Sequence, residues 1–215
     1  MSEFKRMLAI FQQEGINKAI MAGQINPRHI FKKDLSSDTE LLKILSDIKD
    51  KKAETVFGAI ASRLNSSGIE LLDSTLFLAD YLPARGILTK REPNFKEWED
   101  IYFGLDIAKA IAFLDIGQTV AVKDKIVLAV EAFEGTNLTI MRAGRLSKGN
   151  IVIVKVSKPQ QDKRFDIPVV GPLTLRFLIR AKASCLAIEA EKTLIIDKDE
   201  CIALADNKGM TIVAI

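Results

Sequence analysis

Histidine and cysteine are scarce in this chain of 215 residues. His29 is the only histidine, and Cys185 and Cys201 are the only cysteines. The cysteines lack metal-ligand spacing and lie in apolar stretches, so we expect reduced, buried thiols in a cytoplasmic protein. His29 follows Pro27 in a predicted loop, where a surface or capping role is more common than catalysis. Unless His29 is recruited, a Ser-His-Asp or Cys-His mechanism is excluded, and acid–base chemistry falls to carboxylates, lysines or metal-bound water.

Long apolar runs and strongly basic stretches are also missing. The chain is 48% hydrophobic, enough for one large core or two small ones. No run approaches the ~18 residues of a membrane span, and the first residues lack the apolar region of a signal peptide. The net charge is +3, without a basic run that interleaves with aromatics. This composition argues against nucleic acid as a partner.

What the chain does contain is a repeated alternation of helix and strand patterns. Gly15, Gly68 and Gly209 each end a predicted helix directly before an apolar segment. We predict helices over 4–14, 38–49, 53–65, 95–114, 137–143 and 198–208, a short one after Ser74 and one from Pro172, and strands over 17–22, 68–73, 126–133, 151–156, 185–190, 193–196 and 210–215. An Asp197–Glu200 capping box is expected to start the last helix. The pattern predicts an α/β fold.

The chain is expected to form two domains. Residues 87–94 turn polar and include Pro93, which is typical of a linker. We therefore predict a domain over 1–92 and a mixed α/β catalytic domain over 93–215. The first resembles part of a Rossmann-like unit, but it opens on a helix where such a unit opens on a strand. We interpret it as shortened.

The stretch from Gly117 to Pro168 combines apolar strands with charged residues. The apolar runs 126–133 and 151–156 are typical of strands covered on both faces. Yet Glu131 and Glu134 lie in or after the first run, and Lys155 and Lys158 in or after the second. Charges of this kind are costly to bury alone, so they must pair with one another, with a metal or with a ligand.

The segment from Glu134 to Asn137 predicts a strand–turn–helix connection. Gly135 permits a tight turn, Thr136 is a suitable N-cap, and Gly144 could end the helix. A helix that starts in this way presents free backbone N–H groups, which suit phosphate. An ordinary connection without a ligand is the alternative.

Three sequence blocks carry a resemblance to a known family. They read DIGQTV from Asp115, LAVEAFEGT from Leu128 and VKVSKPQQDKRFDIPVVG from Val154. The chain resembles the LpxI-type UDP-2,3-diacylglucosamine pyrophosphatases of lipid A biosynthesis from about Phe4 to its end. The resemblance implies a cytoplasmic hydrolase, peripheral at the inner face of the inner membrane. It implies metal-dependent cleavage of UDP-2,3-diacylglucosamine to UMP and 2,3-diacylglucosamine 1-phosphate (lipid X).

The resemblance and the chemistry of pyrophosphate cleavage together assign roles to the central residues. Mg²⁺ or another divalent cation is expected, held by carboxylates and by the substrate's own phosphates. The expected metal ligands are Glu131, Glu134 and Asp162. The expected catalytic carboxylate is Asp162, with Asp166 as runner-up. The expected substrate-binding residues are Gly23, Gly117, Gln118, Gly135, Thr136, Asn137, Lys155, Lys158, Gln161 and Arg164, among which the lysines and Arg164 would clamp phosphate.

Two positions depart from the family pattern. Asn137 stands where relatives commonly carry aspartate, which weakens a metal ligand there. Glu191 stands where they tend to carry glycine, and we expect its side chain to exclude a positive φ.

Several alternatives stay open at this level. Lys158 and Arg164 could simply neutralise the carboxylates in a buried network. The chain could also be a non-catalytic sugar-nucleotide or anion-binding module, or act on another sugar nucleotide. The sequence leaves the metal, the acyl-chain preference, the phosphorus attacked and any homo-oligomer undecided.

Overall fold

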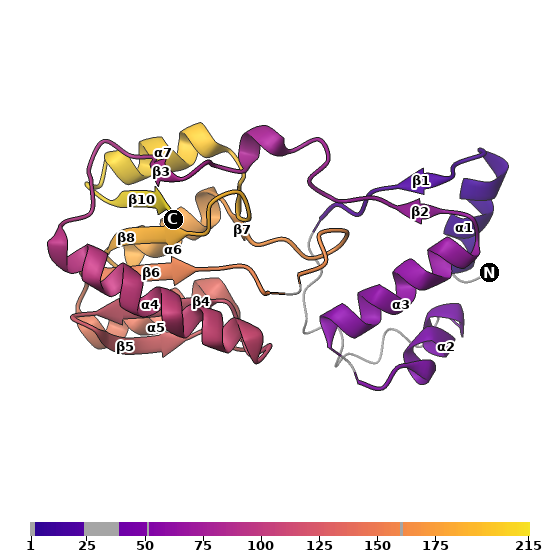
Figure 1. Cartoon of the computed structure of the whole chain (residues 1–215), viewed down its shortest axis with the longest axis horizontal. Helices are drawn as coiled ribbons and strands as arrows, with labels where there is room; N and C mark the ends of the chain where they lie inside the picture. The colour runs from indigo at the N-terminus through magenta and orange to yellow at the C-terminus, as the bar shows by residue number, and fades with distance from the viewer. Residues whose placement is uncertain (1–2, 24–38, 51, 160) are drawn as a thin grey trace. The chain divides into compact units, whose positions relative to one another are not determined.

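The computed structural model describes residues 3–23, 39–50, 52–159 and 161–215. They form two compact units (Figure 1). The N-terminal unit comprises Met1–Phe77 together with Asp162–Asp166, and the C-terminal unit comprises Leu78–Gln161 and Ile167–Ile215. His29 lies outside the described residues. The α/β class expected from the sequence is confirmed.

A six-stranded mixed sheet organises the C-terminal unit, in the order β3-β10-β8-β6-β4-β5. Strands β6, β8 and β10 are parallel, whereas β4 runs antiparallel to both of its neighbours and β3 is antiparallel to β10. The strands are β3 (Gly86–Ile87), β4 (Thr119–Lys123), β5 (Ile126–Val130), β6 (Ile151–Lys155), β8 (Ala183–Ile188) and β10 (Thr211–Ala214). The sheet brings segments from both ends of this unit together.

Helices cover both faces of this sheet (Figure 1). On one face, Ile101 and Ala108 of α4 (Phe95–Phe113) pack against strand residues such as Val152. On the other lie α5 (Thr136–Ser147), α6 (Pro172–Arg180) and α7 (Lys198–Asp206). A short parallel pair, β7 (Val169–Val170) and β9 (Leu194–Ile195), and a 3₁₀ helix (Ala79–Tyr81) complete the unit. Cys185 and Cys201 are buried and free, as expected.

The N-terminal unit is built from short elements around a small core. They are α1 (Glu3–Gln13), β1 (Lys18–Ala19), α2 (Thr39–Asp47), α3 (Ala53–Ser66) and β2 (Glu70–Leu71). Strands β1 and β2 pair in parallel. Leu8, Leu64 and Leu71 are buried in its core, and Phe165 packs against them from far along the chain.

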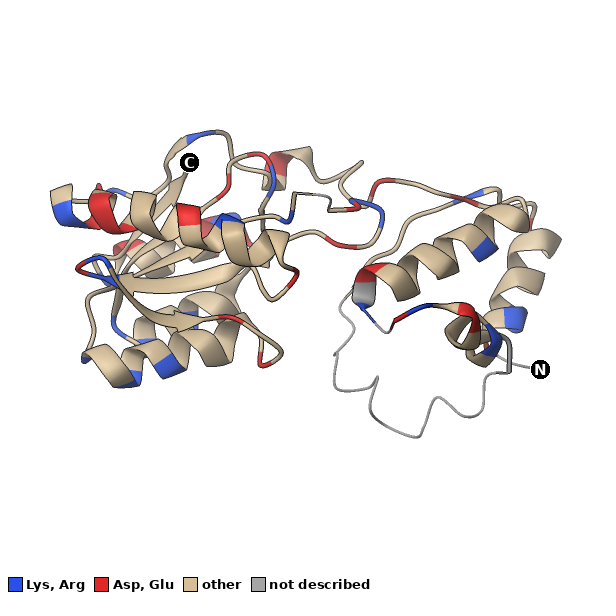
Figure 2. Cartoon of the chain, turned by 60° about the horizontal axis from the view of Figure 1, so that its bottom comes forward, with Lys and Arg blue, Asp and Glu red and all other residues tan. Residues whose placement is uncertain are grey.

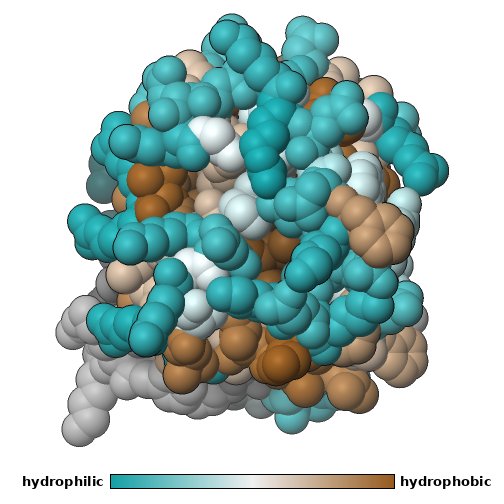
Figure 3. Space-filling model, turned by 90° about the vertical axis from the view of Figure 1, so that its left-hand side faces the viewer, coloured by the Kyte–Doolittle hydropathy of each residue, from teal (hydrophilic) through white to brown (hydrophobic). Residues whose placement is uncertain are grey.

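Polar side chains cover much of the surface. Lys and Arg are interspersed with Asp and Glu along the described elements (Figure 2). The face shown in Figure 3 is mostly hydrophilic, and it lies at the left-hand side of Figure 1, away from the ends to which the β6 and β8 arrows point. Among the described helices, none is long and apolar enough to cross a membrane.

The strand predicted over 126–133 is shorter in the structure. The observed strand, β5, ends at Val130, before Glu131, and lies at the edge of the sheet. Ile126 is 62% exposed, so the strand is not covered on both faces. A continuous apolar run does not distinguish an edge strand from a central one. The second prediction is confirmed, because every residue of β6 is buried.

The predicted limits of α5 were also wrong. Gly135, with a φ of 83°, is the N-cap, and Thr136 already belongs to the helix. Gly144 does not end the helix: a Cβ there would meet the Cβ of Ala181 at 2.7 Å, so glycine serves close packing. The helix ends instead at Ser147 and is followed by the C-cap Lys148, which adopts a left-handed conformation with a φ of 58°.

Helix capping does not follow the sequence prediction. Asp197 has a φ of 51° and its side chain makes no capping bond, so the predicted box at α7 is absent from the described structure. A complete capping box forms at α4, where Asn94 and Glu97 bond to each other's backbone N–H groups. The short helix predicted after Ser74 is a 3₁₀ helix over Ala79–Tyr81 with Leu78 as its N-cap, and the Ser74 hydroxyl donates to the carbonyl oxygen of Arg164.

Residues 87–94, where we expect a linker, have defined contacts within the C-terminal unit. Leu88 N–H donates to the carbonyl of Ile212 at 2.9 Å. The Arg91 guanidinium pairs with Glu97 and donates to the Thr211 hydroxyl. The polar composition of this segment therefore reflects a network that holds the start of α4.

Candidate functional site

One edge of the large sheet gathers most of the predicted binding residues. Strand β6 ends there at Lys155, level with Ile188 at the end of β8. The antiparallel strand β4 begins at the same edge, because Thr119 lies opposite Lys155. Ligands in α/β proteins commonly bind beyond the carboxyl ends of parallel strands. We call this region the carboxyl edge.

A hydrogen-bonded chain links three of the predicted residues at the carboxyl edge. Lys155 Nζ donates to Thr136 Oγ1 at 2.9 Å, and Thr136 Oγ1 donates to Glu131 Oε1 at 2.8 Å. The Gln118 N–H reaches Glu131 Oε2 at 3.4 Å. Glu131 and Lys155 are only 8% and 5% exposed. Buried charges need such partners, and here the Thr136 hydroxyl stands between the two charged groups.

Gly117 allows this arrangement by close backbone approach. A Cβ at this position would lie 2.1 Å from the carbonyl oxygen of Glu131. Only glycine lets the chain before β4 pass so near the end of β5. Gly135 then turns the chain, with its φ of 83°, so that Thr136 opens helix α5 beside Glu131. The backbone geometry therefore explains why glycine stands at Gly117 and at Gly135, two of the predicted substrate-binding positions.

Two buried acceptor atoms lie next to this chain. Among the described residues, Gln118 Oε1 and Asn137 Oδ1 have no hydrogen-bond partner. A buried polar atom left unpaired costs about 1–3 kcal/mol, so it usually has a role or a missing partner. Both residues are predicted to bind substrate. A side-chain amide carries both an acceptor oxygen and an NH₂ donor, so either residue can offer either group to a ligand.

Glu134, a predicted metal ligand, has different partners from Glu131. Its carboxylate pairs with Arg142 at 2.5 Å and accepts from Thr139 Oγ1 at 3.3 Å. Burial raises the pKa of Glu134, but the bonds from Arg142 and Thr139 outweigh it, so the pKa is lowered. An ionised Glu134 is therefore already balanced by Arg142.

The turn after β6 is held by one local contact and one distant contact. Lys158 N–H donates to Gln161 Oε1 at 2.8 Å, and Lys158 Nζ pairs with Asp115 at 2.6 Å. Asp115 opens the first resemblance block and has a φ of 56°. Two predicted substrate-binding residues, Lys158 and Gln161, thus lie together in one turn.

Glu189, which sequence reasoning missed as a site residue, lies at the end of β8. It accepts bonds from the Ser157 N–H at 2.9 Å and from Lys109 and Lys192, both at 2.6 Å. Burial raises its pKa, but these donors outweigh burial and lower the pKa to about 2. A carboxylate directly after an apolar strand is the sequence feature that could have identified Glu189. Through its bond to the Ser157 N–H, Glu189 holds the backbone between Lys155 and Lys158.

The expectation that the side chain of Glu191 excludes a positive φ was wrong. The φ of Glu191 is 58°. The Glu191 N–H donates to the carbonyl of Pro83 at 2.9 Å, which helps to hold the left-handed backbone.

The predicted catalytic segment 162–166 belongs to the N-terminal unit, which the sequence did not indicate. Asp162 Oδ1 accepts from the backbone N–H of Arg164 at 3.0 Å, and Arg164 Nη2 donates to Asp162 Oδ2 at 2.6 Å. The Arg164 bond lowers the pKa of Asp162 more than burial raises it, and the same bond raises the pKa of Arg164. Asp166 N–H donates to the Asp162 carbonyl at 2.9 Å.

The predicted residues therefore divide between the two units. Asp162, Arg164 and Asp166 belong to the N-terminal unit, as does Gly23, which follows β1 with a φ of 112°. The remaining predicted residues belong to the C-terminal unit: Gly117, Gln118, Glu131, Glu134, Gly135, Thr136, Asn137, Lys155, Lys158 and Gln161.

The carboxylates differ in how well they suit a divalent cation. Among the described residues, no group of three or more His, Cys, Asp or Glu side chains is placed to hold a metal ion. Glu131 is buried against Thr136, and Glu134 is paired with Arg142. Asp162 is 27% exposed and is paired with Arg164, much as Glu134 is paired with Arg142, so each of these two carboxylates already has a cationic partner.

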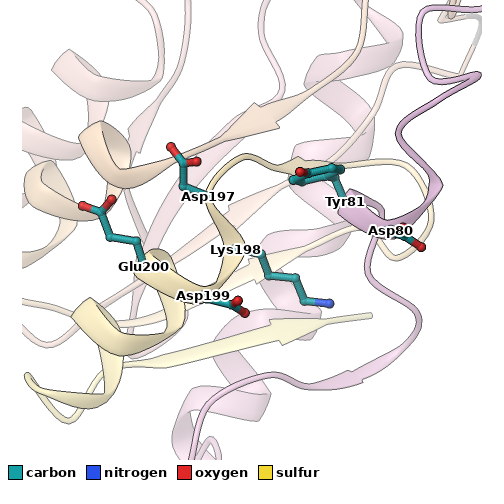
Figure 4. A pocket seen from close by; sticks show the side chains of 6 residues that line it. All are labelled: Asp80, Tyr81, Asp197, Lys198, Asp199 and Glu200. Carbon is teal, nitrogen blue, oxygen red and sulfur yellow. The ribbon is translucent and has the colours of Figure 1, made fainter.

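A separate hollow of about 560 Å³ lies between the 3₁₀ helix and the start of α7 (Figure 4). It is lined by Asp80, Tyr81, Asp197, Lys198, Asp199 and Glu200. None of the predicted site residues lines it. Its largely acidic lining is unfavourable for an anionic pyrophosphate.

Two family models match the chain, one over each end, and residues 162–166 fall within the C-terminal match although they pack in the N-terminal unit. The model of the LpxI N-terminal domain matches residues 1–81, and that of the LpxI C-terminal domain matches residues 84–213. The chain is 30% identical over 224 residues to a Caulobacter vibrioides protein named UDP-2,3-diacylglucosamine pyrophosphatase LpxI. That comparison covers 99% of this chain and 79% of the relative. The chain therefore belongs to the LpxI family.

Proposed function

We propose that this protein hydrolyses the pyrophosphate bond of UDP-2,3-diacylglucosamine and releases UMP and 2,3-diacylglucosamine 1-phosphate. The observation that carries the proposal is the match over 99% of the chain to a relative named for this substrate. The carboxyl edge supports it independently, because its residue types suit a phosphorylated ligand.

The start of α5 is the proposed phosphate-binding element. Gly135 provides no side chain to cap the helix, so its first N–H groups can donate to phosphate oxygens. Thr136 adds a hydroxyl, and Lys155 adds a buried positive charge behind it. Lys158, after β6, is the proposed second cation for the phosphates.

Gln118 and Asn137 are the proposed contacts to the polar part of the ligand. Each has a buried acceptor atom without a partner among the described residues. Sugar hydroxyls and the uracil ring offer both donors and acceptors, so either amide orientation can be satisfied. Gln161, also at the carboxyl edge, is proposed for the same role.

Asp162 is the proposed catalytic carboxylate, with Asp166 as second candidate. Like any aspartate with an ordinary pKa it is ionised at neutral pH, as a metal ligand or a group that orients water must be, and Arg164 lowers its pKa further. Mg²⁺, when bound, would neutralise phosphoryl charge. Asp162 would hold the cation. Arg164, already bonded to Asp162, keeps that carboxylate ionised and can donate to phosphate.

A lipid substrate also requires contact with a membrane surface. We propose a cytoplasmic protein that associates peripherally with the inner membrane. Phe113, Leu114 and Ile116 support this, because all three are exposed large apolar side chains. They directly precede Gly117 at the start of the carboxyl edge.

The experiment is an assay of UMP release with Mg²⁺ and with EDTA. Wild type should release UMP only with the cation, and Asp162→Ala should lose most of the activity. Asp106→Ala is the matched control, because Asp106 is exposed on α4 and should leave activity unchanged. Binding of the substrate by wild type without UMP release would favour a non-catalytic binding module. Equal turnover of UDP-sugars without acyl chains would point to another sugar nucleotide as substrate.

A further inference from the structure

The turn 162–166 is separated in sequence from the rest of the N-terminal unit, yet it is packed into that unit. Phe165 contacts the hydrophobic cluster that contains Leu64 and Leu71. Its ring stacks on Phe57 of α3, with 5.5 Å between the ring centroids. The turn is therefore anchored by a partly buried aromatic contact.

Ser74 anchors the same turn through the backbone. Its N–H donates to the carbonyl of Lys163 at 2.9 Å, and its Oγ donates to the carbonyl of Arg164 at 2.6 Å. Ser74 itself is held in place by its neighbours, because Asp73 accepts from the N–H of Thr75 at 2.7 Å. One serine thus binds two successive carbonyl groups 89 and 90 residues later in the chain.

Backbone N–H groups of the anchored turn donate hydrogen bonds to Asp162. The N–H groups of Phe165 and Asp166 donate to the Asp162 carbonyl at 3.1 and 2.9 Å. The Arg164 N–H donates to the Asp162 side chain at 3.0 Å. A displacement of the turn would therefore displace the Asp162 carboxylate.

We infer that Ser74 is a positioning residue for Asp162. It fixes the 162–166 turn on the N-terminal unit, so that the carboxylate is held in one place before substrate binds. Catalytic groups must be held to within a fraction of an ångström, and small displacements of such groups cost up to about 100-fold in rate. This inference rests on the proposed hydrolase function and assigns a role in it to a residue without reactive chemistry of its own.

The test is steady-state kinetics of Ser74→Ala. We expect kcat to fall about 10- to 100-fold with KM changed little, because the contact acts through Asp162 and not through substrate affinity. Ser74→Thr retains a hydroxyl and should recover part of the lost kcat. Ser67→Ala is the matched control: Ser67 lies in the same unit, its hydroxyl also donates to a backbone carbonyl, that of Arg63, and its replacement should leave kcat unchanged.

A double-mutant cycle separates positioning from a general effect on folding. In the Asp162→Ala background, Ser74→Ala should have little further effect on the residual rate, because both changes remove the same contribution. Amide exchange in the 162–166 peptide should rise in Ser74→Ala and not in Ser67→Ala.

Three results would count against the inference. If wild type turns over substrate and Ser74→Ala is unchanged, the inference alone is wrong. If the two losses multiply in the double mutant, Ser74 acts through the fold and not through Asp162. If wild type shows no turnover, the proposed function fails and this inference fails with it.

Discussion

Replacement of Glu189 by glutamine should destabilise the C-terminal unit in a pH-dependent way. The carboxylate is 12% exposed and accepts bonds from Lys109, Lys192 and Ser157. These donors lower its pKa from 4.5 to about 2. A shift of about 2.5 units corresponds to about 3–4 kcal/mol before screening by solvent. Both lysines are partly exposed, so we expect about 2 kcal/mol at neutral pH.

The sign follows from the depressed pKa. Unfolded Glu189 binds a proton below about pH 4.5, whereas the folded form stays ionised until about pH 2. The stabilisation is therefore complete above about pH 4.5 and is lost as the pH falls toward 2. The difference between wild type and Glu189→Gln should shrink over that range.

Urea unfolding of both proteins at pH 7, 5 and 3.5 measures this difference. We expect a gap of about 2 kcal/mol at pH 7, nearly the same at pH 5, and about half as large at pH 3.5. Asp106→Asn, an exposed carboxylate on α4, provides the control and should show no pH-dependent gap. A gap that is absent at pH 7, or that grows as the pH falls, would refute the assigned role of Glu189.

Three further predictions concern single positions. Gly117→Ala should cost about 1–3 kcal/mol in denaturant unfolding, because its Cβ would overlap the Glu131 carbonyl; an unchanged midpoint would contradict the close approach. Glu191→Gly should raise the melting temperature, with a gain of up to about 1 kcal/mol, because it relieves a φ of 58°; a lower melting temperature would count against this. Burial raises the pKa of Cys185, and raises that of Cys201 to about 12, so neither should react with Ellman's reagent until urea unfolds the protein; rapid labelling of the native protein would show that a thiol is accessible.

Local patterns in the sequence identified most elements of the fold. Apolar periodicity and glycine punctuation placed α1, α3, α4 and β6 close to their observed limits. Capping was predicted at Asp197 and forms at Asn94 instead. Both positions carry a suitable side chain followed three residues later by glutamate. The choice depends on tertiary contacts, since Glu97 also pairs with Arg91.

Long-range packing explains what the sequence could not indicate at the site. Glycine is typical of a helix end, which is why the sequence predicts that α5 ends at Gly144. In the structure Ala181 packs against Gly144, and the helix continues past it. The turn 162–166 follows a strand of one unit, yet Phe165 enters the core of the other. Gly144 and Ala181 are 37 positions apart, and Phe165 and Leu64 are 101 apart. Periodicity within a short window carries no information about such contacts.

The proposed hydrolysis is tested most directly by ³¹P NMR of UDP-2,3-diacylglucosamine incubated with wild-type protein and Mg²⁺. The account predicts that the coupled pyrophosphate signals disappear. Two monophosphate signals, from UMP and the acylated sugar 1-phosphate, should replace them in a one-to-one ratio. Asp162→Ala should leave the pyrophosphate signals in place. Persistence of those signals with saturating wild-type protein, or formation of UDP instead of UMP, would contradict the account.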